Sequence, residues 1–97
     1  MSKFLLQLSW TEQGIKALKN FPKRSQAARE TGKKLGVEIE QVYVTTGDSD
    51  LLLILDSANG DNVAKFALAL ASLGNVRTRM SRAWTEAEFG KMLSELP

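Results

Sequence analysis

Side chains that could take part in chemistry gather in two stretches of this chain. The first is Gly47-Asp48-Ser49-Asp50, which precedes five aliphatic residues and then Asp56. The second is "NVRTRMSR", which places Arg77 and Arg79 two residues apart. A carboxylate can transfer a proton, and a planar guanidinium can bind a carboxylate or phosphate through two parallel hydrogen bonds. These two functions are the chemistry that we consider for this chain.

The three aspartates are not expected to form one site. Asp50 and Asp56 are separated by a strand-like segment and would lie roughly 20 Å apart at about 3.3 Å per residue. They are therefore too distant to act as a carboxylate pair within one chain. Asp48 is expected in a turn, where its carboxylate can accept backbone N–H groups. No further oxygen ligands follow at a metal-binding spacing, so we predict no metal site and retain Asp50 as the functional candidate.

Composition excludes several classes of function. The chain has no cysteine and no histidine, which excludes disulfides, thiolate ligands, an imidazole base and histidine metal ligands. We therefore predict no cofactor. Thirteen basic and eleven acidic residues give a net charge of +2, which is too small to indicate nucleic-acid binding. The apolar stretch in "MSKFLLQLSW" is too short for a signal peptide or a membrane span, so we expect a cytoplasmic protein.

Hydrophobic periodicity and end signals predict the secondary structure. Alternation and β-branched content predict strands over 3–10, 37–46, 51–55 and 75–84. Helical spacing and capping residues predict a short helix after Thr11 and longer helices over 22–35, 62–74 and 85–96, the last with a capping box of Thr85 and Glu88. Strict alternation in the second strand would put Val37, Ile39, Gln41 and Tyr43 on one face, opposite Glu38, Glu40, Val42 and Val44.

The order β-α-β-β-α-β with a closing helix predicts one α+β domain over residues 1–97 with a ferredoxin-like fold. Its four-stranded antiparallel sheet would carry helices on one face only. Because "LLLIL" (51–55) is apolar on both sides, the uncovered face is expected to pack against the sheet of a second copy. Arg77 and Arg79 would then point into the cavity between the copies. Alternatively, they are edge-strand charges that discourage unwanted pairing.

Other side chains have both a structural and a functional interpretation. The hydroxyl of Tyr43 could reach the same cavity or could be satisfied locally. Arg24, in "KRSQAAR", is expected on a solvated helix face together with its basic neighbours. Trp10 and Trp84, each before Thr-Glu, are expected to anchor helix starts by packing.

Longer segments carry a resemblance to a known family. They are "YVTTGDSDLLLILDS", "ALALASLGNVRTRMSRAWTEAEF", "SWTEQGIKALK" and "KRSQAAR". On these segments the chain resembles the GYD domain family over nearly its whole length. These are small bacterial proteins placed with the dimeric α/β barrels, without a defined biochemical role. The resemblance implies a ferredoxin-like fold and a homodimer. Where the family has Gly, a polar residue, Tyr and Asp, this chain has Gly47, Asp48, Ser49 and Asp50, so a serine replaces the tyrosine.

We therefore predict a homodimeric α/β barrel, not demonstrably enzymatic, that binds a small acidic or amphipathic ligand in its interior. The candidate ligand-binding residues are Tyr43, Asp50, Arg77 and Arg79. An alternative is a cofactor-independent oxygenase or isomerase that uses Tyr43, Asp50 and an arginine as acid-base and electrostatic groups. RNA-recognition modules share the element order, but "DLLLILD" lacks their stacking aromatic residues. We expect neither nucleic acid nor membrane as a partner.

Overall fold

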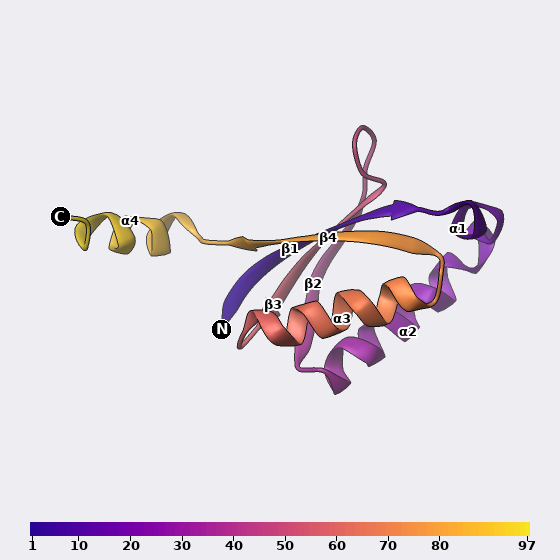
Figure 1. Cartoon of the computed structure of the whole chain (residues 1–97), viewed down its shortest axis with the longest axis horizontal. Helices are drawn as coiled ribbons and strands as arrows, with labels where there is room; N and C mark the ends of the chain where they lie inside the picture. The colour runs from indigo at the N-terminus through magenta and orange to yellow at the C-terminus, as the bar shows by residue number, and fades with distance from the viewer.

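The chain folds in the order β-α-β-β-α-β, followed by a final helix (Figure 1). The computed structural model describes all 97 residues. In chain order the elements are β1 (Ser2–Trp10), α1 (Glu12–Lys16), the 3-10 helix η1 (Leu18–Asn20), α2 (Phe21–Lys34), β2 (Val37–Val44), β3 (Leu51–Ser57), α3 (Gly60–Ser72), β4 (Val76–Ala83) and α4 (Glu86–Ser94). Each predicted strand and helix is confirmed, with small differences at the ends.

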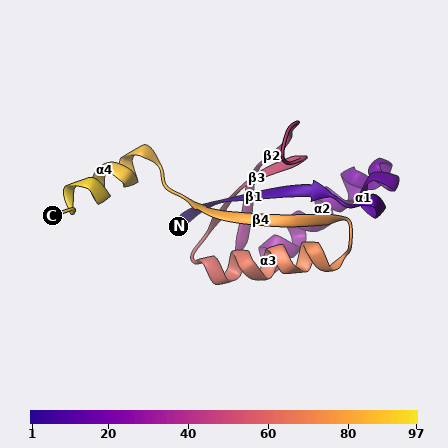
Figure 2. The same ribbon diagram turned by 45° about the horizontal axis from the view of Figure 1, so that its top comes forward.

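The four strands form one antiparallel sheet in the order β2-β3-β1-β4. The two most apolar strands, β1 and β3, are therefore central, as a ferredoxin-like fold requires. Helices α2 and α3 cover one face of the sheet, and α4 continues away from the end of β4 (Figures 1 and 2). The predicted α+β fold with helices on one face is confirmed. None of the helices combines the length and the apolar character needed to cross a membrane.

The hydrophobic core lies between the sheet and the two helices. It contains Phe4, Leu6 and Leu8 of β1, Val37 of β2, Leu51, Leu53 and Leu55 of β3, and Val63, Phe66, Ala67 and Leu70 of α3. Burying this apolar surface is the main favourable contribution to folding. On the other side of the sheet, which we call the open face, Leu5, Leu52 and Ile54 are only half-buried. The prediction that "LLLIL" is apolar on both sides of the sheet is therefore confirmed.

Strand β2 contains a bulge that changes which side chains face the helices. Ile39 pairs with Leu55, but the next pairs are Gln41 with Ile54 and Val42 with Leu53, so Glu40 is an extra residue. A bulge of this kind puts two residues opposite one and reverses the later alternation. The predicted alternation is consequently wrong after Glu40. Val42 faces the helices beside Leu53, whereas Tyr43 lies on the open face beside Leu52.

The predicted helix caps at Thr11 and Thr85 are confirmed. The Thr11 hydroxyl accepts the Gly14 N–H, the Asn59 side chain accepts the Asn62 N–H, and Thr85 and Glu88 form a reciprocal capping box.

The two tryptophans differ in how far they are buried. Trp10 packs against the core, but Trp84 is 50% exposed, with the Arg82 guanidinium 4.7 Å from its ring centre. Within one chain, the predicted packing role of Trp84 is therefore wrong, because α4 does not fold back over its ring.

Candidate functional site

Three of the predicted ligand-binding residues lie on the open face. Arg77 and Arg79 of β4 pair with Ser9 and Gln7 of β1, so both project away from the helices, as predicted. Tyr43 is on the opposite edge strand, and its hydroxyl donates a hydrogen bond to Gln41 Oε1. Three strand spacings separate Tyr43 from Arg79, which corresponds to about 14 Å. Within one chain, these residues share a face but do not converge on one point.

Asp50 supports the backbone at the base of the β2–β3 loop. Its Oδ2 accepts the Trp10 N–H at 2.8 Å, and its own N–H donates to the Leu8 carbonyl at 2.8 Å. The Thr45 N–H and hydroxyl close the loop by donating to the carbonyls of Asp50 and Ser49, at 2.8 and 2.7 Å. The Asp50 carboxylate therefore joins the end of β1 to the loop.

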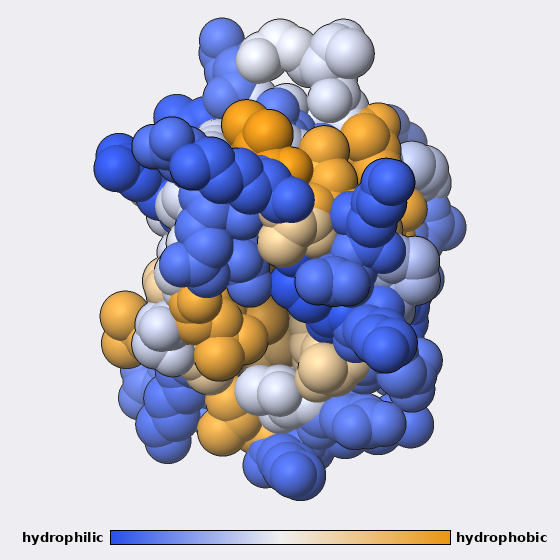
Figure 3. All heavy atoms as spheres, turned by 90° about the vertical axis from the view of Figure 1, so that its right-hand side faces the viewer, coloured by the Kyte–Doolittle hydropathy of each residue, from blue (hydrophilic) through white to orange (hydrophobic).

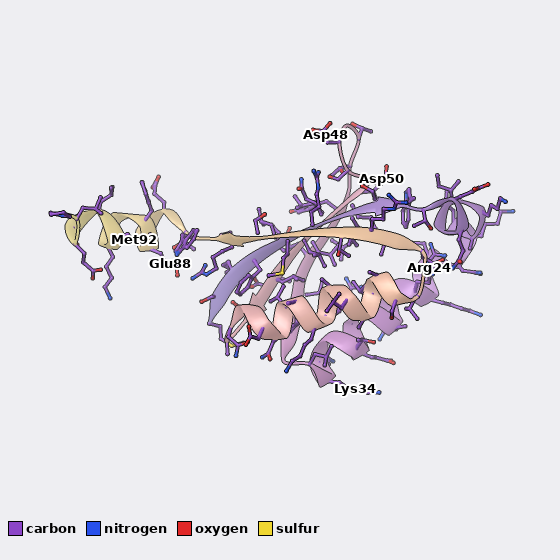
Figure 4. The ribbon with its side chains drawn as sticks, in the orientation of Figure 1. Arg24, Lys34, Asp48, Asp50, Glu88 and Met92 are labelled. Atoms are coloured by element: carbon purple, nitrogen blue, oxygen red, sulfur yellow. The ribbon has the colours of Figure 1, made fainter.

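The remaining motif residues shape that loop. Gly47 has φ +98°, a conformation that side chains with a Cβ rarely adopt. Ser49 is buried, whereas Asp48 lies exposed at the loop tip (Figure 4). No backbone N–H donates to the Asp48 carboxylate, so the predicted hydrogen bond is wrong. The reason is that Thr45, and not Asp48, supplies the side-chain hydrogen bond that closes the loop.

One end of the open face carries an ionic cluster. Lys3 Nζ lies 2.5 Å from Glu40 Oε1 and 3.6 Å from Asp56 Oδ1. The hydrogen bond to Glu40, followed by the negative charge of Asp56, raises the pKa of Lys3 above its ordinary value of 10.5. Glu40 reaches this lysine because it is the bulged residue of β2. The sequence did not indicate this cluster, since its members come from three strands.

A mostly apolar feature with room for a ligand lies on the other side of the sheet. A partly open cavity of about 260 Å³, which we call the interior cavity, is lined by the helix-facing side of the sheet and by residues of α2 and α3. Its walls are mostly apolar and include Trp10, Phe21, Ile39, Val42 and Leu53. Figure 3 shows the molecule from the end where α1 meets α2. In this view, apolar residues form the floor of a recess between hydrophilic side chains. None of Tyr43, Asp50, Arg77 and Arg79 lines this cavity.

Arg24 of α2 is the charged side chain of the interior cavity. Its Nη1 donates to the Ala17 carbonyl at 2.7 Å, and its guanidinium carbon lies 5.8 Å from the Trp10 ring centre. Its Nη2 is buried and has no hydrogen-bond partner. The prediction of a solvated Arg24 is therefore wrong. A signal was present, because Arg24 lies three residues after Phe21 and four before Ala28, on the buried side of the helix.

The aromatic wall beside Arg24 is built by two elements. The rings of Trp10 and Phe21 meet edge to face, with centres 5.8 Å apart and planes at 88°. Trp10 ends β1 and Phe21 begins α2, so the junction through α1 and η1 brings them together. Aromatic pairs in this geometry add attraction beyond their buried area. The cavity therefore has a defined aromatic side next to its cation.

Comparison with models of known protein families gives one match for this sequence. The model of the GYD domain matches residues 4–93. The chain belongs to the GYD domain family. The family resemblance read from the sequence is therefore confirmed. No curated protein matches this GYD-domain chain.

Two solved structures resemble this member of the family in fold. The first is the feast or famine regulatory protein Rv3291c from M. tuberculosis, solved in complex with L-methionine, with a TM-score of 0.65 and 15% identity. The match covers 88% of this chain and 51% of that protein, so the GYD-domain chain spans about half of the regulator's length. The second is TTHA0845 from Thermus thermophilus, with a TM-score of 0.56, 21% identity, and coverage of 88% and 95%. At these sequence identities, the two similarities show a shared fold and nothing further.

Proposed function

We propose that this GYD-domain protein is a homodimer that binds a small amphipathic molecule in the interior cavity of each subunit. The observation that carries the proposal is the apolar cavity of about 260 Å³ inside a 97-residue fold. Protein interiors normally leave few voids larger than a water molecule. A dry cavity of about 150 Å³ can accept benzene, so the interior cavity has room for a ligand of roughly ten non-hydrogen atoms. Burying that ligand's apolar surface would supply most of the affinity.

Exposed apolar surface supports the homodimer. The open face presents Leu5, Leu52 and Ile54 at its centre, and charged groups lie toward its ends. Helix α4 extends away from its own subunit (Figures 2 and 4). It carries the exposed apolar side chains Phe89, Met92 and Leu93, and Leu96 follows just beyond its end. Exposed apolar patches on soluble proteins commonly mark interaction surfaces, and two-fold pairing of identical faces is the commonest solution. A second copy would cover both surfaces.

The residues predicted from sequence take distinct roles in this proposal. Tyr43, Arg77 and Arg79 would line the space between two facing sheets, where they can bind a second acidic group or pair across the dimer. Asp50 retains Oδ1 as a further acceptor while Oδ2 holds Trp10. A related fold offers modest support for small-molecule binding, because Rv3291c was solved with L-methionine, itself a small amphipathic molecule.

Ligand binding in the interior cavity can be tested with a neutral probe ligand and with a variant in which a larger side chain fills the cavity. The probe is 3-phenylpropanamide, and its binding is measured by isothermal titration calorimetry on the intact dimer. Ala28→Phe adds bulk to the cavity wall and should abolish binding, while Gln26→Phe adds the same bulk at an exposed position of α2 and should leave it unchanged. Absence of binding to the wild type, or equal effects of the two variants, would contradict the proposed cavity.

A further inference from the structure

We infer that the interior ligand is a monocarboxylic acid with an apolar body, and that Arg24 binds its carboxylate. This inference rests on the proposed function of the interior cavity and adds the chemical class of the ligand. The first observation is the unsatisfied donor. Arg24 Nη1 is held by the Ala17 carbonyl at 2.7 Å, but Nη2 is buried without a partner. A buried donor on a charged group is costly to leave unpaired, so a ligand that brings an acceptor to Nη2 would gain that stabilisation.

The second observation is the charge balance around the cavity. Arg24 takes part in none of the ion pairs of the chain, which join Lys3 to Glu40 and Asp56, and Lys16 to Glu12. The cavity walls contain no carboxylate, and beyond Arg24 their polar side chains are Ser25, Thr31 and Asn75. A guanidinium in apolar surroundings without a counter-ion strongly favours an incoming anion. A single cation balances the one negative charge of a carboxylate better than the two charges of a phosphate dianion, and the planar guanidinium can pair with a carboxylate through two parallel hydrogen bonds.

The neighbouring groups define how the acid would be oriented. The Ser25 hydroxyl accepts a hydrogen bond from Arg29 at 2.7 Å and has its own proton available for a second carboxylate oxygen. The Ala17 carbonyl and the Trp10 ring hold the guanidinium on its other sides. The apolar body of the ligand would extend from Arg24 toward Ile39, Val42 and Leu53. Arg24 therefore selects the head group, and the sheet and Phe21 accommodate the body.

The test compares a matched pair of probes on the intact protein: 3-phenylpropanoate and its neutral amide, 3-phenylpropanamide. At neutral pH the wild type should bind the acid roughly ten- to a hundredfold more tightly than the amide, the range expected for a hydrogen bond to a charged partner. Arg24→Met should remove this preference while retaining amide binding. Arg24→Lys, which keeps the charge without the planar fork, should retain part of it. Lys23→Met, which removes an exposed cation from the same helix, should leave the preference unchanged.

The outcomes separate this inference from the proposed function. Equal binding of acid and amide by the wild type, or an acid preference that survives in Arg24→Met, would overturn the role of Arg24 and leave the cavity as a site for neutral ligands. Failure of both probes to bind would instead overturn the cavity's function itself. If Arg24→Met does not fold, the acid-to-amide ratio of the wild type and its decrease in Arg24→Lys still decide the question.

Discussion

The carboxylate of Asp50 accepts the backbone N–H of Trp10 at 2.8 Å, across forty residues of sequence. This contact joins the last residue of the motif loop to a wall of the interior cavity. The Trp10 ring in turn lies 5.8 Å from the Arg24 guanidinium and from the Phe21 ring. The loop on the open side of the sheet and the cavity on the helix side are therefore connected through one residue of β1.

That contact gives unequal roles to the two aspartates of the loop. Asp50→Ala should lower the free energy of unfolding by about 1–3 kcal/mol, since it leaves the part-buried Trp10 N–H without its acceptor. Asp48→Ala, at the exposed loop tip, should stay within about 0.5 kcal/mol of the wild type. Urea denaturation of both variants measures the difference. Equal effects would show that the Asp50 hydrogen bond contributes little.

Opposite faces of β3 should respond differently to a charge. Leu53 is 4% exposed beneath the helices, so Leu53→Lys should prevent stable folding. Ile54 is half-buried on the open face, so Ile54→Lys should preserve the fold but separate the proposed dimer. Sedimentation velocity at low micromolar concentration, with circular dichroism for the fold, distinguishes the two outcomes. A wild type that sediments as a monomer under these conditions would contradict dimerisation through the sheet.

Gly14 allows α1 to lie against the start of β4. A Cβ at this position would overlap the Asn75 carbonyl oxygen, a contact that requires the backbone to move. Gly14→Ala should therefore destabilise the protein by about 2 kcal/mol or more. Gly90, in α4, has open space around it, so Gly90→Ala should be neutral or stabilising by up to about 1 kcal/mol. Thermal unfolding checks both, and a tolerated Gly14→Ala would refute the close approach.

The capping box of α4 should respond to acid. The Thr85 N–H donates to Glu88 Oε1 at 2.8 Å, and this hydrogen bond lowers the pKa of Glu88 below its ordinary value of 4.5. The carboxylate therefore stabilises the helix above pH 4.5, and the contribution is lost as pH falls through the lowered pKa. Backbone chemical shifts across 86–94 should show this loss of helix between about pH 5 and pH 2. The same titration of Glu88→Gln should lack the transition, because glutamine caps without titrating.

Local patterns in the sequence were sufficient for the elements and their order. Alternation and β-branched content identified the strands, and Thr11 and Thr85 marked helix starts through hydrogen bonds within a few residues. Such signals depend on near neighbours in the chain, so they can be recognised without knowing how the elements pack. The central apolar strands then implied the ferredoxin-like sheet, which the structure confirms.

Contacts between distant segments required the tertiary structure. The bulge at Glu40 moved Tyr43 to the open face, because one inserted residue reverses a period-two pattern without changing its composition. The inward turn of Arg24 depends on the Ala17 carbonyl and the Trp10 ring, which α1 and η1 bring to it. The interior cavity is likewise the space left between elements after they pack. Its volume and its unpaired cation follow from the distances between those elements, which periodicity along the chain does not contain.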